Sequence, residues 1–154
     1  MKYLAYGANM DEAIMYSRCR DAVLLDTGVM PDYRLMFKGE EPNAYATIEP
    51  WKGYSVPYVL WEISNDDLLA LDRFEGYPTH YLRYWGDVEF DGKSVEVIYY
   101  AKPDELPIGQ PMTHYVEVLQ AAYERFGFDM NILDEALRFS NEDYQRRFKR
   151  RFKQ

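Results

Sequence analysis

One glutamate in this chain stands where its carboxyl group could act as an acid or a base. Glu75 precedes Gly76 in the segment LALDRFEG, whose apolar spacing predicts a helix that ends at the glycine. The carbonyl end of a helix dipole repels an anion, and Asp72 adds a second negative charge three residues earlier. Both effects, together with any burial, raise the pKa of a carboxyl group and suit it to proton transfer near neutral pH. The alternative is a solvated glutamate on an exposed helix end, partly balanced by Arg73.

A glycine turn near the start of the chain is the second feature that could bind or activate a substrate. In MKYLAYGANM, residues 3–6 form a short apolar and aromatic run that is typical of a strand, and Gly7, Ala8 and Asn9 follow directly. The turn could be structural alone, since glycine permits a sharp turn and asparagine is a good helix cap. If it is functional, its successive backbone N–H groups would form a concave site for a carboxylate or a developing oxyanion.

Other common site chemistries are disfavoured by residue type and spacing. His80, His114 and Cys19 do not form any metal-ligand spacing, and the chain has no phosphate-binding glycine pattern. Cys19 lies between two arginines without a neighbouring nucleophile pattern, so we interpret it as a surface or packing cysteine. We therefore expect neither a metal nor a cofactor.

The expected elements put these two features at the end of a strand and at the end of a helix. After the opening strand, a short helix is predicted over 11–18. Four further strands are predicted, at 22–30, 33–38, 44–50 and 55–63. Ser64, with Asp67 three residues later, predicts the start of the helix that Gly76 ends. The pattern indicates a mostly antiparallel β-core.

The second half of the chain adds a hairpin and then becomes helical. Strands are predicted at 81–90 and 94–101, and Asp91 with Gly92 between them is a strong hairpin signal. Prolines then mark a stiff connection into the helical third. Helices are predicted at 113–126, at 131–139 and from Ser140 onward.

Composition indicates one folded domain spanning residues 1–154. Hydrophobic residues make up 47% of the chain and aromatic residues 17%, including 15 tyrosines, which suits β-structure and pockets with polar rims. The start of the chain lacks the pattern of a signal peptide, and no apolar run approaches the ~20 residues that a membrane-spanning helix needs. We therefore expect a cytoplasmic protein without a membrane partner.

Charge is divided unevenly along the chain. Residues 1–145 contain 12 basic and 26 acidic residues, a net charge of −14, whereas residues 146–154 contain six basic residues and no acidic one. An acidic body disfavours nucleic acid as the main ligand. The basic tail, residues 146–154, could bind RNA or an anionic membrane, but a solvated helical end explains it as well, and we favour that interpretation.

Together, the glycine turn and the glutamate segment resemble motifs of the γ-glutamylcyclotransferase-like superfamily. Its members carry a Tyr-Gly-Ser-Asn-Leu type turn after the first strand and a catalytic glutamate in a Leu-Asp-x-x-Glu-Gly segment. Here these read YGANM at 6–10 and LDRFEG at 71–76, in the same order. The resemblance extends to PYVLWEISNDDLLALD, to P-x-x-x-Y at 111–115 and to SNEDY near the end, so it covers nearly the whole chain.

The resemblance implies an α+β fold, with a small, mixed, twisted β-barrel, peripheral helices and a helical C-terminal region. It implies an enzyme, a γ-glutamylcyclotransferase, that releases 5-oxoproline from a small γ-glutamyl substrate. In this reaction the substrate's own α-amine attacks its γ-carbonyl and expels the attached amine. Glu75 would be the catalytic acid and base. The residues implied to bind the γ-glutamyl group are Tyr3, Leu4, Tyr6, Gly7, Ala8, Asn9 and Tyr115.

The resemblance leaves the leaving group and the activity itself open. Ala8 stands where many relatives have serine, which removes a hydroxyl that could bind substrate but keeps the backbone N–H. The substrate could be a γ-glutamyl peptide or a γ-glutamylamine, or the enzyme could remove a γ-glutamyl protecting group. The alternative function is a noncatalytic module that binds a small carboxylate or γ-glutamyl ligand in the same pocket.

Overall fold

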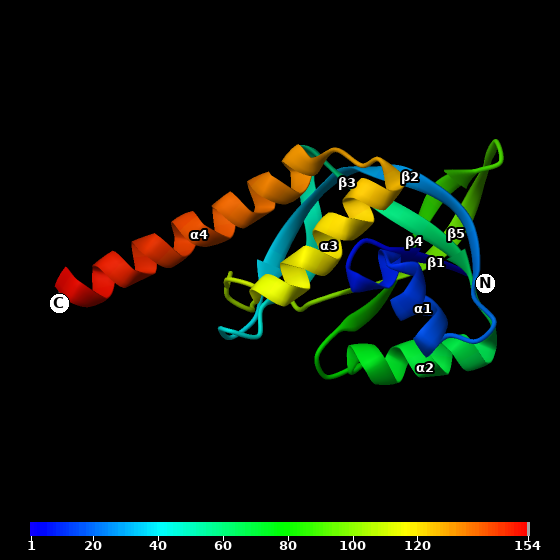
Figure 1. Ribbon diagram of the computed structural model, residues 1–154, viewed down its shortest axis with the longest axis horizontal. Coiled ribbons are helices and arrows are strands. Elements are labelled where there is room, and N and C mark those ends of the chain that lie inside the picture. The colour runs from blue at the N-terminus through cyan, green and yellow to red at the C-terminus, as the bar shows by residue number, and fades with distance from the viewer. Residues whose placement is uncertain (154) are drawn as a thin grey trace.

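Two long antiparallel strands dominate the fold and run side by side for most of their length (Figure 1). The computed structural model describes residues 1–153, with side chains through residue 150. The sheet is made of β1 (Lys2–Ala5), β2 (Val23–Lys38), β3 (Tyr45–Glu62), β4 (Leu82–Phe90) and β5 (Lys93–Ala101). Their order is β2-β3-β1-β5-β4. Because β1 pairs with β5 in parallel and the other pairs are antiparallel, the sheet is mixed.

The α+β fold with a mixed sheet is confirmed, but the sheet is open rather than closed. β2 and β4 lie at its two edges, and no pairing joins them among the described residues. A barrel needs its edge strands to meet, so the predicted barrel is only a loose description. The long strands β2 and β3 curve instead, as Figure 1 shows, in keeping with the natural twist of long strands.

The four strands predicted between residues 22 and 63 are two strands in the structure. The break predicted between residues 30 and 33 does not end β2, because the strand stays paired with β3 across a register shift between Pro31 and Tyr33. At that shift Asp32 has a φ of 61°, and its Oδ1 accepts a hydrogen bond from the Gly53 N–H at 3.0 Å. A bulge therefore absorbs the irregular residues within one hairpin.

The predicted start and end of α2 (Asn65–Glu75) are confirmed. The Ser64 hydroxyl accepts a hydrogen bond from the Asp67 N–H, and the Asp67 carboxylate accepts one from the Ser64 N–H, both at 3.1 Å. Gly76 ends the helix in the left-handed region, with a φ of 67°. A Cβ added at Gly76 would also lie 2.6 Å from Cδ2 of His80, so both conformation and space favour glycine. These caps fix Glu75 as the last residue of α2.

Three further predictions on helices and turns are confirmed. β1 leads into the short 3-10 helix η1 (Ala8–Met10), and Asp11 then caps α1 (Glu12–Arg18) by accepting a hydrogen bond from the Ile14 N–H at 2.9 Å. β4 and β5 form the expected hairpin. α3 (Thr113–Phe126) ends at Gly127, which again has a left-handed φ of 69°.

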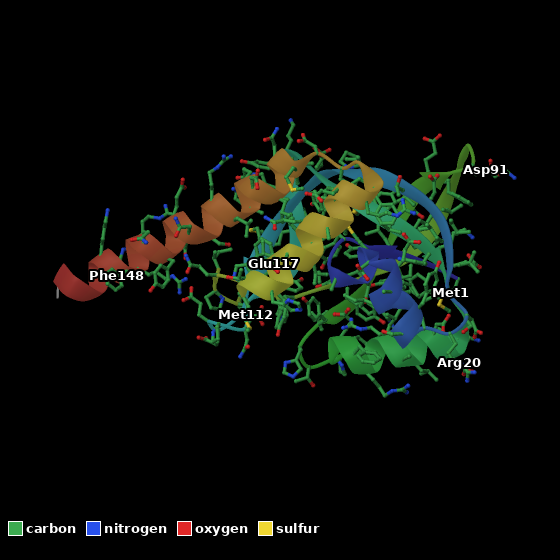
Figure 2. The ribbon with its side chains drawn as sticks, viewed as in Figure 1. Met1, Arg20, Asp91, Met112, Glu117 and Phe148 are labelled. Carbon is green, nitrogen blue, oxygen red and sulfur yellow. The ribbon has the colours of Figure 1, made fainter. Side chains whose placement is uncertain are left out.

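The last helix, α4 (Met130–Lys153), is continuous, so the prediction that a new helix begins at Ser140 is wrong. Ser140 is only 1% exposed, so its side chain packs inward within the helix instead of capping an end. The C-terminal part of α4 carries the described part of the basic tail and extends away from the body, with Phe148 on it (Figures 1 and 2). Gln154 lies outside the described residues.

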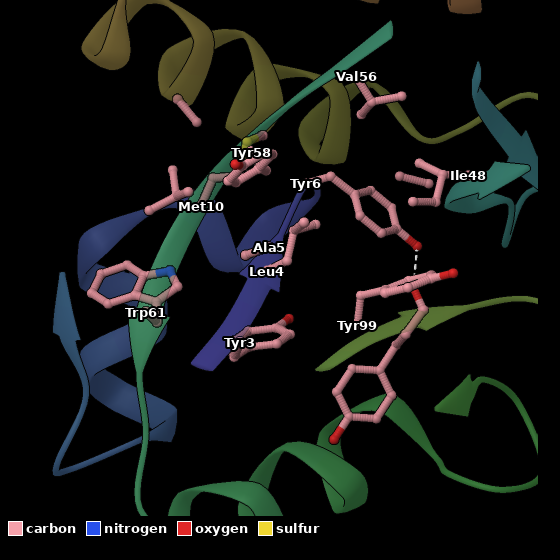
Figure 3. Close-up of a cluster of buried hydrophobic side chains, with 14 of the residues drawn as sticks. Tyr3, Leu4, Ala5, Tyr6, Met10, Ile48, Val56, Tyr58, Trp61 and Tyr99 are labelled. Carbon is pink, nitrogen blue, oxygen red and sulfur yellow. Dashed lines mark hydrogen bonds between the residues drawn. The ribbon is translucent and has the colours of Figure 1, made fainter. Parts of the chain in front are cut away.

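The core lies between the sheet and the helices that cover it. Its largest fully buried side chains come from all the helices and from β1, β2, β3 and β5, and include Trp61, Tyr123, Phe37 and Leu119. Figure 3 shows the part around β1, where the Tyr6 hydroxyl donates a hydrogen bond to the Tyr100 carbonyl of β5. Because β1 also pairs with β3 on one side and with β5 on the other, its C-terminal end supports the turn that follows. In the part of the chain that the structure describes, no helix has both the length and the apolarity to cross a membrane.

Candidate active site

A cavity of about 560 Å³ lies where the glycine turn meets the end of α2. Its wall brings together residues from β1, η1, α2 and α3 that are far apart in the sequence. Of the residues predicted for the site, those that line the cavity are Tyr3, Tyr6, Gly7, Ala8, Asn9, Glu75 and Tyr115. The structure thus brings the two motifs into one pocket.

Leu4 is the predicted site residue that does not line this cavity. It is 1% exposed and belongs to the hydrophobic core. Successive side chains of a strand point to opposite faces, so in β1 Tyr3 reaches the cavity and Leu4 packs on the other side. The role of Leu4 is to hold the strand in the core.

Gly7 is not required by the backbone conformation of the turn. Its φ of −114° lies outside the left-handed region. A Cβ added there would lie 3.4 Å from the Tyr115 hydroxyl and 3.8 Å from the Ala46 Cβ, which is ordinary van der Waals contact. Because Gly7 has no side chain, the turn presents its backbone to the cavity, and a bound molecule can approach that backbone closely.

Glu75 is partly buried and faces the turn, so the alternative of a solvated helix end is wrong. Its Oε1 accepts a hydrogen bond from Nδ2 of Asn9 at 3.2 Å. Burial raises the pKa of Glu75 above its ordinary value. The positive charges of Arg18 and Lys102, with the hydrogen bond from Asn9, oppose that rise. The Glu75 carboxyl group therefore has an increased affinity for a proton, and the hydrogen bond from Asn9 orients it.

The helix dipole, Asp72 and burial were the predicted causes of a raised Glu75 pKa, and that prediction is only partly right. Burial is the largest cause. Asp72 is not among the groups that shift the pKa of Glu75, and its carboxylate accepts hydrogen bonds from Arg83 Nη1 at 2.7 Å and from the Tyr100 hydroxyl at 2.6 Å. The cations that act on Glu75 come from elsewhere in the chain, and Arg73 is not one of them.

Arg18 determines which way the Asn9 amide points. Its Nη1 donates to Asn9 Oδ1 at 2.9 Å, and a guanidinium group has donors only. The amide NH₂ group must then face the other way, where it donates to Glu75 and to the Tyr3 hydroxyl, the latter at 3.0 Å. The indole of Trp61 donates to the Asn9 carbonyl at 3.0 Å and fixes the backbone as well. Asn9 is thus a positioned donor toward the carboxyl group.

Sequence reasoning missed three tyrosines and a lysine that also line the cavity: Tyr45, Tyr81, Tyr100 and Lys102. The Ala46 N–H donates to the Tyr115 hydroxyl at 3.1 Å, and the Tyr81 hydroxyl donates to the Ala46 carbonyl at 2.8 Å. Lys102 lines the cavity directly after β5, with its Nζ 4.5 Å from the centre of the Tyr81 ring. A lysine that ends an apolar strand such as SVEVIYYA is the one local signal that could have found it.

The tyrosine hydroxyls of the wall remain protonated. Burial raises the pKa of Tyr3, Tyr6, Tyr81 and Tyr115, and the negative charge of Glu75 adds to the effect in each. These groups can donate or accept hydrogen bonds but do not supply a base. Glu75 is therefore the carboxyl group that lines the cavity, and its raised pKa makes it a stronger base than an ordinary glutamate.

Cys19 does not add a second reactive centre. Cys19 is fully buried, and burial raises the pKa of its thiol to about 12, so the expectation of a packing cysteine is confirmed and a surface position is wrong. Within the described part of the chain, no group of three or more His, Cys, Asp or Glu side chains is arranged to hold a metal ion.

Comparison with known families identifies the relatives of the chain. The profile of the family described as gamma-glutamyl cyclotransferase, AIG2-like, matches residues 3–121, which is more than half of the chain. No curated protein sequence gives a significant match. The matched region contains both the glycine turn and Glu75.

Several solved structures have a similar fold. A gamma-glutamyl cyclotransferase superposes with a TM-score of 0.78 at 21% identity, over 88% of this chain and 85% of that one. A protein from Homo sapiens, described as uncharacterized, gives 0.76 at 21% identity over the same shares. YkqA from Bacillus subtilis gives 0.73 at 22% identity, over 92% of this chain and 54% of YkqA. At these identities the likeness shows a shared fold.

Proposed function

The chain belongs to the AIG2-like gamma-glutamyl cyclotransferase family, and we propose that it releases 5-oxoproline from a γ-glutamyl peptide or γ-glutamyl amine. Family and fold both support chemistry of the cyclotransferase type. One observation carries the finer proposal: Glu75, with its raised pKa, lines the same cavity as the turn formed by Gly7, Ala8 and Asn9. A carboxyl base beside a concave backbone surface is what an intramolecular cyclisation requires.

In the proposed reaction, the α-nitrogen of the γ-glutamyl group attacks the γ-carbonyl carbon and closes a five-membered lactam. The bond between that carbon and the leaving nitrogen breaks. The α-ammonium loses two protons, and the leaving amine gains them and departs as an ammonium ion. Glu75 accepts a proton from the attacking nitrogen and delivers a proton to the leaving nitrogen, which its raised pKa favours near neutral pH.

The glycine turn is proposed to hold the α-carboxylate of the γ-glutamyl group. Ala8 begins the helix η1, and the first N–H groups of a helix lack partners within it. The lack of a side chain at Gly7, which lines the cavity, would let the carboxylate approach them. Ala8 lacks the hydroxyl that many relatives have, so binding would rest on the backbone.

The aromatic wall is proposed to keep bulk water away from the reacting carbonyl. Tyr3, Tyr6, Tyr81 and Tyr115 surround the carboxyl side of the cavity with ring surface. Excluding water favours attack by the substrate's own amine over hydrolysis and strengthens electrostatic interactions within the site.

The test is 5-oxoproline release. The purified protein is incubated with γ-L-glutamyl-L-alanine and a series of other γ-glutamyl peptides and amines, and 5-oxoproline is measured by chromatography. α-L-Glutamyl-L-alanine is the matched control, since its amide is at the wrong carbon for this ring closure. Release from at least one γ-glutamyl compound and none from the control is the expected result. Binding without release from any of them would favour the noncatalytic module.

A further inference from the structure

Lys102 is a buried cation that faces the cavity without an acidic partner at contact distance. The residue is 7% exposed and lines the cavity. Within the described part of the chain, no carboxylate oxygen lies within 4.0 Å of its Nζ. Glu75 acts on it only as a more distant charge. Burial lowers the pKa of Lys102, because a charged amine loses solvation there.

The other buried cations of the chain are treated differently. Lys38 is 6% exposed, and its Nζ donates to the carboxylate of Glu49 and, at 2.9 Å, to the Asp104 carbonyl. Arg34, also 6% exposed, is paired with Glu135 at 2.6 Å. Buried charges are normally paired in this way, because an isolated one is costly. Lys102 departs from that pattern, and it lines the cavity that also contains Glu75.

The surroundings of Lys102 hold the ammonium group toward the cavity. Its backbone N–H donates to Oγ1 of Thr47 at 2.8 Å, which anchors the residue at the end of β5. Its Nζ lies 4.5 Å from the ring centre of Tyr81 and 5.6 Å from that of Tyr45. Ring faces attract a cation but form no directed hydrogen bond to its N–H groups, so those donors stay available to an anionic ligand.

We propose that Lys102 binds a carboxylate on the leaving amine, and that the preferred substrates are γ-glutamyl conjugates of amino acids rather than of uncharged amines. The inference rests on the proposed function, in which the Gly7 turn holds the other carboxylate, that of the γ-glutamyl group. Pairing with the leaving-group carboxylate gives the buried ammonium the partner it lacks. Lys102 is thus a specificity-determining residue of the cavity.

Two unreactive probes test this inference separately from turnover. Glutaryl-L-alanine and glutaryl-L-alaninamide lack the α-amine and cannot cyclise, and they differ only in whether the leaving side ends in a carboxylate or an amide. Their affinities are measured by calorimetry for the wild type, Lys102→Met and Lys102→Arg. Lys93→Met, at an exposed position on β5, is the control for removal of a lysine charge. γ-L-Glutamyl-L-alanine and its amide are then compared as substrates.

The wild type should bind the acid about 10- to 100-fold more tightly than the amide, the range for a hydrogen bond to a charged group. Lys102→Met should lose that preference while keeping its affinity for the amide within about threefold, and Lys102→Arg should retain part of it. Equal affinity of the wild type for both probes, no binding of the acid, or an equal loss for both probes in Lys102→Met would overturn the inference. The wild-type comparison decides the matter even where Lys102→Met does not fold. If the wild type prefers the acid probe but releases no 5-oxoproline, the role of Lys102 in ligand binding stands and the proposed reaction is rejected. If it releases 5-oxoproline but binds both probes equally, the proposed reaction stands and the role of Lys102 is rejected.

Discussion

Replacing Glu75 with glutamine should remove proton transfer while leaving the shape of the site intact. Glutamine has nearly the same size, and its amide oxygen can still accept the hydrogen bond that Asn9 Nδ2 donates to Oε1 at 3.2 Å. The amide cannot take a proton from the attacking amine. The substitution therefore separates the chemical role of Glu75 from its structural role.

The expected loss of turnover in Glu75→Gln is about 10²–10⁴-fold, the usual contribution of general acid–base catalysis. This corresponds to about 3–5 kcal/mol of transition-state stabilisation. Because Glu75 is assigned to both proton transfers, the loss should lie toward the upper end. Affinity should change little, because the γ-glutamyl carboxylate is assigned to the backbone at Gly7. The wild-type rate should rise with pH as Glu75 and the substrate amine deprotonate, whereas the residual rate should follow only the amine, with its reference pKa of ~7.7–8.0.

The same substitution should change stability with a defined pH dependence. The pKa of Glu75 is raised in the folded protein above the ordinary value of 4.5. Between the two values the folded state binds more protons than the unfolded state, so stability falls as pH rises, and above the folded pKa the full penalty is present. Glutamine carries no charge, so Glu75→Gln should have a higher Tm than the wild type at pH 7, and the difference should vanish below about pH 4.

The assays are 5-oxoproline release against pH, ligand affinity by calorimetry and thermal unfolding at pH 4 and pH 7. Asp66→Asn is the matched control, since Asp66 lies on the exposed start of α2, away from the cavity. A folded Glu75→Gln variant that turns over within a few-fold of the wild type would refute the assignment of Glu75 as the base.

Three further predictions address the turn, the arginine and the tail. Gly7→Ala should fold with a Tm close to that of the wild type, because the added Cβ makes only ordinary van der Waals contacts. Its affinity for glutaryl-L-alanine should fall about tenfold or more. Unchanged affinity would mean that the turn does not face the ligand. Arg18→Met should move the acidic limb of the kcat/KM profile to higher pH, because it removes a charge that lowers the pKa of Glu75. Arg18→Lys should partly restore the wild-type profile, and Arg20→Met, at an exposed position, should leave the profile unchanged. An unchanged acidic limb in Arg18→Met would contradict the action of Arg18 on Glu75. Deleting residues 146–154 should leave turnover within about threefold of the wild type, because none of the described side chains in this segment lines the cavity. Tm should fall, because the deletion removes the hydrogen bond from Arg147 to the Ile108 carbonyl. A large loss of turnover in a folded truncation would assign the tail to the site.

Features that depend on a few adjacent residues were predictable from the sequence. The serine cap and the glycine stop of α2 act locally, so they predicted both ends of the helix on which Glu75 lies. Asp91 and Gly92 likewise predicted the β4–β5 hairpin. Local signals failed where long-range pairing overrode them, as at Pro31, where continued pairing with β3 carries β2 through a bulge.

The partners of Glu75 could not be predicted, because they come from distant segments. Lys102 reaches the site because β5 pairs in parallel with β1, and nothing near residue 75 in the sequence encodes that pairing. Asp72 was expected to raise the pKa of Glu75 from its helical spacing alone, but Arg83 and Tyr100 bind its carboxylate. Spacing on a helix says which residues share a face, and only the tertiary structure says which partner each side chain finds.

The net charge of the whole chain does not predict the charge of the cavity. The protein carries a formal net charge of −8, yet its cavity is lined by Arg18, Arg73 and Lys102 against the single carboxylate of Glu75. Arg18 and Lys102 both lower the pKa of Glu75, while burial raises it. If a substrate carboxylate pairs with Lys102, it neutralises one of these cations and also displaces water. Both changes raise the pKa of Glu75 further, so a substrate that satisfies Lys102 would strengthen the base that acts on it.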